Sequence, residues 1–139
     1  MIVLDTNVLS ELMKPGPLIA VTNWVASQPA SSLFVTTITQ AEILHGVMLL
    51  PKGHRRAAIE AAAIAMFEED FAGRILTFGS LVAHAFAEIA ADRRQSGRPI
   101  SQFDAQIASI ARSTGASIAT RNVADFDGCG IHVINPWQP

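Results

Sequence analysis

The sequence predicts an α/β protein with three layers, in which helices flank a central, mainly parallel sheet of about five strands. Three observations carry this prediction. Short strands alternate with helices along the whole chain. The strands are apolar on both faces, as parallel strands buried between helices are. Half of the 139 residues are hydrophobic, which suits a single domain over residues 1–139 with one packed core.

The individual elements follow from apolar periodicity and from turn residues. The run LFVTTI is β-branched and aromatic, which predicts a strand, and RILTF predicts another. Proline or glycine stands where the helical periodicity stops, as at Pro15, Pro51, Gly97 and Gly115. The expected strands span residues 1–4, 33–38, 74–78, 117–120 and 131–134. The expected helices span residues 6–14, 18–27, 39–50, 54–71, 81–96 and 101–115.

Composition excludes several classes of protein. Cys129 is the only cysteine, so the chain can form no internal disulfide and no cysteine-rich metal site, and a reducing, cytoplasmic compartment is expected. No apolar run is long enough to span a membrane, and the N-terminus lacks the basic region of a signal peptide. The net charge of −2 gives no prior for nucleic-acid binding.

Four acidic residues are expected at the carboxyl ends of strands, where folds of this class bind ligands. Asp5 directly follows the first strand, and Glu42 is expected in the first helical turn after LFVTTI. Asp104 lies in the first turn of the helix that Ser101 begins, and Asp125 lies in the loop TRNVADF. Clustered carboxylates repel one another unless a cation lies among them, and ligands that are all oxygen suit Mg²⁺ or Mn²⁺.

Each acid also has a structural interpretation. Thr39-x-x-Glu42 and Ser101-x-x-Asp104 both fit a capping box, in which the acid satisfies N–H groups at a helix start. Asp5 alone is a good N-cap, and Asp125 alone is an ordinary turn residue. Capping does not explain why acids follow successive strands at the ligand-binding end of the sheet, so the set favours a metal site.

Five motifs together resemble one family. MIVLDTNVLSEL, TTITQAEILHGV, FDAQIASIAR, ATRNVADF and HVINPW occur in this order over nearly the whole chain, and they resemble PIN-domain proteins of the VapC/FitB toxin group. The resemblance implies a Rossmann-like fold and a metal-dependent ribonuclease that is the toxin of a toxin–antitoxin pair. It further implies cleavage of transfer or ribosomal RNA, a homodimer, a VapB/FitA-like antitoxin and a larger assembly with operator DNA.

The resemblance also assigns roles by position. Asp5, Glu42 and Asp104 match the family's most dependable acids, and the fourth acid is expected at Asp125, with Asn122 as an alternative polar ligand. Polar support for the site is expected from Thr6, Asn7, Thr39 and Thr120. With one or two metal ions held by Asp5, Asp104 and Asp125, Glu42 would complete the coordination or position a water.

Basic residues give a weaker expectation of RNA contacts. Of 12 acidic residues, four belong to the expected site, which leaves 8 against 10 Lys and Arg. Phosphate contacts are expected from Arg121 beside the site and from two clusters, although a charged helix face is commonly only solvated. The clusters are Lys52-Arg55-Arg56 and Arg93-Arg94-Arg98.

Other functions fit less well. A phosphatase with Asp5 as nucleophile needs a second acid two residues later, where this chain has Asn7, and a receiver domain needs an acid pair. A PIN-like scaffold that binds RNA or protein without cleaving stays open, because the fourth acid is uncertain. An antitoxin tail is expected to dock beside Leu9, Leu12, Ile43 and Val47 and to place an arginine among the acids, although core packing is the alternative role for these four.

Overall fold

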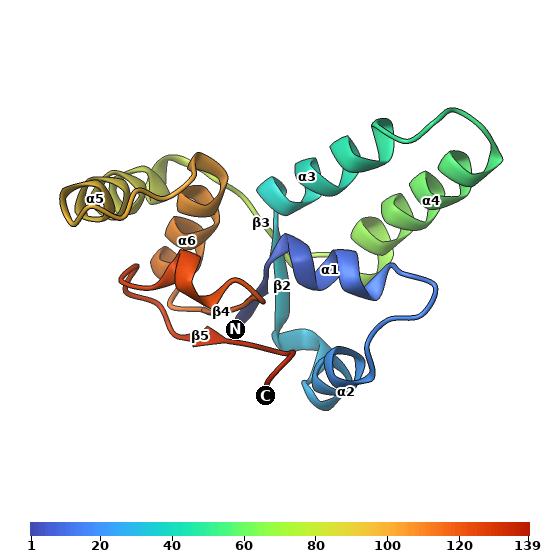
Figure 1. Cartoon of the computed structure of the whole chain (residues 1–139), viewed down its shortest axis with the longest axis horizontal. Coiled ribbons are helices and arrows are strands. Elements are labelled where there is room, and N and C mark those ends of the chain that lie inside the picture. The colour runs from blue at the N-terminus through green and yellow to red at the C-terminus, as the bar shows by residue number, and fades with distance from the viewer.

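The computed structural model describes residues 1–139 and shows five parallel strands in one sheet (Figure 1). The strand order is β3-β2-β1-β4-β5, so β1 lies at the centre. The expected three-layer α/β fold is therefore confirmed. The strands are β1 (Ile2–Leu4), β2 (Leu33–Thr36), β3 (Ile75–Leu76), β4 (Ser117–Ala119) and β5 (Val133–Ile134).

Six α-helices connect and cover these strands. Helices α5 and α6 lie on one side of the central strands, and α1, α2 and α4 lie on the other (Figure 1). The helices are α1 (Thr6–Leu12), α2 (Ile19–Ser27), α3 (Thr37–Met48), α4 (His54–Ala65), α5 (Ala83–Gln95) and α6 (Gln102–Thr114). No helix of the chain has the length and apolar character that crossing a membrane requires.

The sheet divides the hydrophobic core into two clusters. One cluster contains Leu4, Leu9 and Phe67, and it packs α1, α2 and α4 on one face of the sheet. The other contains Val3, Ile107 and neighbouring residues of α5 and α6. Adjacent residues of β1 thus point to opposite clusters, as the alternation of side chains along a strand requires.

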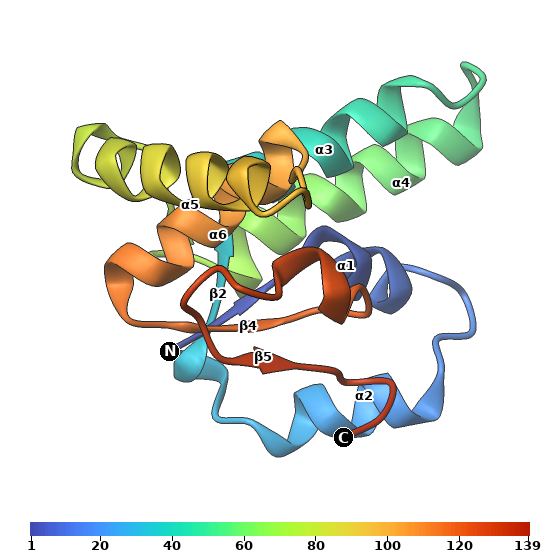
Figure 2. The same ribbon diagram turned by 60° about the vertical axis from the view of Figure 1, so that its left-hand side comes forward.

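The order of the strands creates a switch point beside β1. The chain builds outward from β1 to β2 and β3, and then returns to add β4 and β5 on the opposite side of β1. Strands β4 and β5 lie side by side at that edge (Figure 2). In parallel α/β sheets the ligand crevice lies at the carboxyl ends of the two strands where the direction reverses, here β1 and β4.

The expected boundary between residues 33–38 and 39–50 is wrong by two residues. Strand β2 ends at Thr36, and α3 begins at Thr37. Thr36 is the N-cap, because its side-chain oxygen accepts the main-chain N–H of Thr39 at 3.1 Å. Thr39 is therefore inside the helix, and the capping box that was the alternative interpretation of Thr39 and Glu42 does not form.

Other expected elements are shorter than predicted. Strands β3 and β5 have two residues each, instead of the five and four expected. Helix α4 ends at Ala65, and a wider helical turn follows over Met66–Asp70. The C-terminus of α6 is as expected: Gly115 adopts a left-handed conformation, with φ of 70°, that stops the helix.

Candidate active site

Asp5 lies at the carboxyl end of β1 and begins α1. Its main-chain N–H donates to the Ala119 carbonyl at 2.9 Å, which continues the pairing of β1 with β4. Its Oδ1 accepts the Thr6 N–H at 2.8 Å, so Asp5 is the N-cap of α1. Its Oδ2 accepts the Thr120 hydroxyl at 2.8 Å and the Asn7 amide at 3.2 Å. The carboxylate is thus held by donors from the start of α1 and from the residue that follows β4.

The charge of Asp5 has no cationic partner within hydrogen-bond distance. The residue is 5% exposed, and burial raises the pKa of its carboxyl to about 6. The negative charges of Asp104 and Glu42 contribute to this rise, and the hydrogen bonds from Thr120 and Thr6 oppose it. These neutral donors orient the carboxylate without neutralising it, so a cation bound there would relieve the cost of its burial.

Glu42 reaches the same site from the second turn of α3. Its Oε1 accepts the Thr6 hydroxyl at 2.8 Å, and the Thr6 hydroxyl also lies 3.0 Å from the hydroxyl of Thr39. Thr39 is fully buried, so this pair of hydroxyls joins α1 to α3 beneath Glu42. Glu42 therefore contacts a second helix and does not cap α3, and it lies one turn later than the first turn in which the sequence placed it.

Asp104 lies in the first turn of α6, as predicted. The Ser101 side-chain oxygen accepts the Asp104 N–H at 3.2 Å, so Ser101 is the N-cap. Burial raises the pKa of the Asp104 carboxyl, and the negative charge of Asp125 adds to this effect. A hydrogen bond with the Ser101 side chain lowers the same pKa, so Ser101 acts on both the main chain and the carboxyl of Asp104.

A cavity of about 380 Å³ brings these acids together. Asp5, Glu42 and Asp104 all line it, although they are far apart in sequence and belong to different elements. Asn122 lines it too, whereas Asp125 does not. The full lining is Asp5, Thr6, Asn7, Ser10, Glu11, Lys14, Glu42, Asp104, Arg121, Asn122 and Trp137.

The loop after β4 supports the site through Thr120. This residue is fully buried, and its hydroxyl donates to Asp5 while it accepts the Asn122 N–H at 3.0 Å and the Asn7 amide at 3.2 Å. The Asn7 side-chain oxygen accepts the Arg121 N–H at 3.2 Å. Asn7 and Thr120 therefore fix the loop that carries Arg121 and Asn122 against the start of α1.

The chemistry of the donors fits a hard divalent cation. Asp5, Glu42 and Asp104 offer only oxygen ligands, and no histidine or cysteine lines the cavity. No group of three His, Cys, Asp or Glu side chains lies close enough to hold an ion by protein atoms alone. Mg²⁺ commonly keeps several of its waters and is bound by one or two carboxylates, so this wider spacing is compatible with it.

Four residues of the cavity were not predicted from the sequence: Ser10, Glu11, Lys14 and Trp137. Three of them lie on α1 or directly after it. The polar residues Asn7, Ser10, Glu11 and Lys14 recur at helical spacing, three or four residues apart, on a helix whose other face is apolar. This polar stripe is a signal in the sequence from which Ser10, Glu11 and Lys14 could have been predicted.

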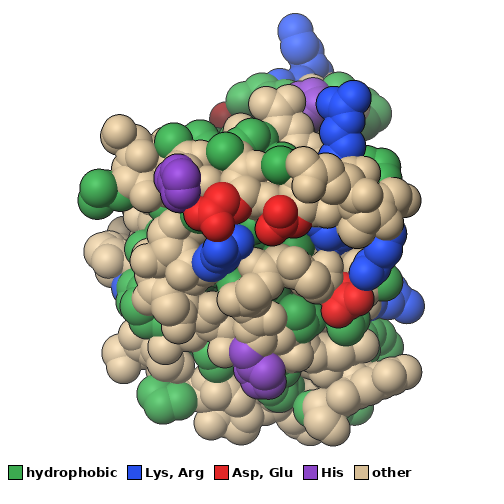
Figure 3. Space-filling view, turned by 90° about the vertical axis from the view of Figure 1, so that its left-hand side faces the viewer, with side chains coloured by type: hydrophobic (Ala, Val, Ile, Leu, Met, Phe, Trp, Pro, Cys, Tyr) green, Lys and Arg blue, Asp and Glu red, His purple; other side chains and the backbone are tan.

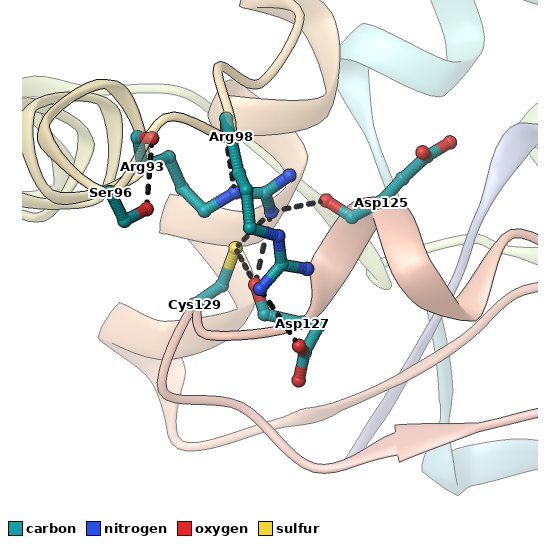
Figure 4. A network of polar contacts seen from close by, with 6 residues as sticks. All are labelled: Arg93, Ser96, Arg98, Asp125, Asp127 and Cys129. Atoms are coloured by element: carbon teal, nitrogen blue, oxygen red, sulfur yellow. Dashed lines mark hydrogen bonds and ion pairs between the residues drawn. The ribbon is translucent and has the colours of Figure 1, made fainter.

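Arg93 was expected to contact RNA, and the structure corrects this expectation. It is buried, and its guanidinium donates to the main-chain oxygens of Arg98 at 2.7 Å, Asp125 at 2.7 Å and Asp127 at 3.0 Å (Figure 4). The Asp125 carboxylate points away from this network (Figure 4). Arg93 therefore fastens the loop after β4 to the C-terminal end of α5.

The other basic candidates differ in their placement. Arg121 lines the cavity, but Arg55, Arg56 and Arg94 do not. Arg98 forms an exposed ion pair with Asp127 at 3.0 Å. The face shown in Figure 3 mixes basic and acidic side chains and has no continuous basic patch. Only Arg121 is thus both basic and adjacent to the acids among the residues expected to contact RNA.

A parallel α/β sheet with carboxylates gathered at its switch point defines a class: α/β proteins whose acidic pocket suits a divalent cation. The sequence model described as the PIN domain matches residues 2–127, and the chain belongs to the PIN-domain family, in its VapC/FitB-like group. The predicted resemblance is confirmed.

Individual relatives are similar over their whole length. The chain is 37% identical to the VapC ribonuclease Y4jK of Sinorhizobium fredii, over all of this chain and 99% of the relative. It is 35% identical to the toxin FitB of Neisseria gonorrhoeae, over 99% of each chain. A solved structure of FitAB bound to a DNA fragment contains a chain that superposes with a TM-score of 0.93 at 35% identity, covering 99% of this chain and 96% of that one.

Proposed function

We propose that this protein is a metal-dependent endoribonuclease that acts as the toxin of a toxin–antitoxin pair. One observation carries the proposal: Asp5, Glu42 and Asp104 reach a single cavity from three elements, and the buried Asp5 lacks a cationic partner. The names of the relatives, a VapC ribonuclease and the toxin FitB, support RNA as the substrate and toxicity as the role. Transfer or ribosomal RNA is the proposed substrate class.

The residues of the cavity have different proposed roles in catalysis. Asp5 and Asp104 would hold Mg²⁺ or Mn²⁺ through their carboxylate oxygens. When bound, the ion supplies charge neutralisation at a phosphate oxygen and lowers the pKa of a bound water. Thr120 and Asn7 fix the orientation of Asp5, and Thr6 fixes that of Glu42. Glu42 is thereby placed to accept a proton from the attacking water or to position that water.

The fourth polar position has two candidates. Asn122 lines the cavity and offers an amide oxygen, whereas Asp125 lies outside the lining and acts on Asp104 through its charge. We propose that Asn122 contacts the metal or its waters and that Asp125 acts at longer range. This assignment differs from the sequence-based preference for Asp125.

An antitoxin is the proposed protein partner, and a solved complex of FitA with FitB on DNA supports it. Two cavities border the residues expected to form its groove. Ile43 and Val47 line one of about 380 Å³ that also reaches Thr6 and Glu42, and Leu9 and Leu12 line another of about 440 Å³. The first adjoins the acids, so a tail bound there would deliver an arginine to them. A homodimer and a larger assembly with operator DNA complete the proposal.

A cleavage assay tests the catalytic part of this proposal. The purified chain should cut RNA with Mg²⁺ or Mn²⁺, stop in EDTA and recover when the ion is restored. Asp104→Asn should abolish cleavage without loss of stability, because asparagine keeps the shape of the side chain and leaves the main-chain N–H that Ser101 caps. Asp92→Asn, which changes an exposed acid of α5, is the matched control and should cleave normally. Activity in EDTA would overturn the metal mechanism, and an active Asp104→Asn variant would overturn the role of Asp104. A wild-type chain that cleaves no RNA with either ion would favour the non-cleaving scaffold.

A further inference from the structure

We propose that Lys14, anchored by the buried Glu11, forms with Arg121 a phosphate-binding wall of the acidic cavity that binds the backbone of the RNA strand. The inference rests on the proposed ribonuclease function and deepens it. Both cations line the same cavity as Asp5, Glu42 and Asp104. The proposed ligand is a phosphodiester of a single strand, bound next to the bond that is cleaved.

Glu11 is an unusual residue for a polar helix face because it is almost completely buried, with 4% exposure. Both of its carboxylate oxygens are used. Oε1 accepts the Lys14 ammonium at 3.0 Å, and Oε2 accepts the main-chain N–H of Leu18 at 3.1 Å. The hydrogen bond from Lys14 lowers the pKa of the Glu11 carboxyl, and the bond from Leu18 adds to this effect. Glu11 therefore stays charged and holds Lys14 and the turn after α1 in one arrangement.

Lys14 itself remains accessible. Its side chain is 59% exposed although its partner is buried, and its ammonium has three donor directions, of which Glu11 uses one. An ordinary surface ion pair loses side-chain entropy on both partners, which offsets much of its attraction. Here the carboxylate is fixed by Leu18 in advance, so Lys14 is presented to the cavity with less ordering left to be done on binding.

Arg121 is held by a different part of the chain. Its guanidinium carbon lies 5.5 Å from the centre of the Trp137 ring, in a cation–π arrangement, and its main-chain N–H donates to Asn7. Trp137 packs on the hydrophobic cluster beneath α1 and α2. Stacking uses the face of the guanidinium and leaves the N–H groups at its edge free to bind a phosphate bidentately.

Lys14 and Arg121 offset the negative charge of the cavity toward an RNA phosphate. A phosphodiester that approaches Asp5, Glu42 and Asp104 is repelled by their carboxylates, and a divalent ion at these acids offsets only part of that repulsion. Fixed cations on the same cavity attract the backbone and set its register, while the chemistry stays with the acids. Lys14 and Arg121 thus act on binding, and Glu11 is a positioning residue that acts through Lys14.

The test compares Lys14→Met with Arg112→Met in a cleavage assay on a short single-stranded RNA with Mg²⁺. Arg112 is the matched control, because it also forms a surface ion pair, with Glu88 at 3.2 Å, and does not line the cavity. Lys14→Met should raise KM about tenfold, as the loss of one charged contact does, and leave kcat within about twofold. The slope of log KM against log salt should fall by about 1. Arg112→Met should change neither, and Lys14→Arg should restore most of the loss.

Glu11→Gln tests the positioning role separately. Glutamine still accepts one hydrogen bond but removes the charge that anchors Lys14, so KM should rise less than in Lys14→Met. The double variant should have the KM of Lys14→Met alone, because Glu11 acts only through Lys14. A purely structural ion pair predicts a lower melting temperature with unchanged KM and salt slope in every variant.

The outcomes separate this inference from the function on which it rests. If the wild type cleaves RNA and folded Lys14→Met keeps the wild-type KM and salt slope, the phosphate wall is wrong and the ribonuclease proposal stands. A loss of kcat at constant KM would place Lys14 in the chemical step and would also overturn the wall. If the wild type cleaves no RNA, both proposals fail. Lys14→Gln replaces Lys14→Met if the latter does not fold.

Discussion

Asp5 and Arg93 are two buried charges that the fold treats in opposite ways. Each is less than one-tenth exposed. Arg93 donates to three main-chain oxygens, so its charge is solvated by the protein. Asp5 receives three neutral donors and has two further acids close enough to raise its pKa. A buried charge therefore indicates a functional site only when its surroundings leave that charge uncompensated.

The largest expected effect follows from replacing Asp5. Asp5→Asn should reduce RNA cleavage by more than about a hundredfold, because even partners that only support a metal ligand contribute about tenfold to a hundredfold. The metal-free variant should be at least as stable as the wild type, since it removes an unpaired buried charge while asparagine still caps α1. Cleavage rates measure the expected loss of activity, and urea unfolding curves measure the stability of the metal-free variant. A variant that is both active and less stable would show that Asp5 is only a cap.

Arg93 should give the reverse pattern. Arg93→Met removes the donors of three main-chain oxygens, and the loss of stability should be about 3 kcal/mol, with little change in kcat of the folded protein. Arg94→Met is the matched control on the next residue of α5, and as an exposed substitution it should change stability by less than about 0.5 kcal/mol. A raised KM with unchanged stability in Arg93→Met would instead support the RNA contact expected from the sequence.

The pH dependence of stability should expose the uncompensated charge directly. The pKa of Asp5 rises from 3.8 to about 6 on folding, so the folded protein binds the proton more readily than the unfolded chain between these values. The free energy of unfolding of the metal-free protein should therefore fall as pH rises from about 4 to about 6, by about 3 kcal/mol for this group alone. The raised pKa of Asp104 adds a change of the same sign.

Two comparisons identify the source of that slope. Asp5→Asn should flatten it, and Asp92→Asn should not. Saturating Mg²⁺ should restore stability at neutral pH, because the ion binds the folded acids. Glu11 works with the opposite sign: because its pKa is lowered on folding, its contribution to stability is complete above its ordinary pKa and is lost as pH falls below it, at the acidic end of the Asp5 window. A slope that is the same in Asp5→Asn and wild type would mean that Asp5 does not titrate in this range.

The sequence predicted the topology and three acids of the cavity because each depends on local patterns. Apolar strands, helix caps and strand ends place Asp5, Glu42 and Asp104 without any knowledge of tertiary contacts. It could not choose among the threonines of LFVTTIT as the cap of α3, since the pairing of Thr36 with Leu76 of β3 sets where β2 ends. Nor could it tell that Arg93 faces inward and Arg94 outward, because one residue of helical phase separates them and packing fixes that phase.

The same limit applies to the fourth position of the site, and the smallest expected effect concerns it. Asn122 and Asp125 lie in one short loop, and only the tertiary arrangement places Asn122 on the cavity.

Asn122→Ala should lower cleavage about tenfold, in the range of a residue that supports a metal site, and should weaken the apparent affinity for Mg²⁺. Asp125→Asn should cost only a few-fold, since it changes the field at Asp104 and no contact of the cavity. It should also lower the pKa of Asp104, because a repelling charge is removed. Metal titrations of the cleavage rate in both variants measure the difference. If Asp125→Asn proves more damaging than Asn122→Ala, the acid carries the fourth position, and its carboxylate must turn into the cavity when the ion and the RNA bind.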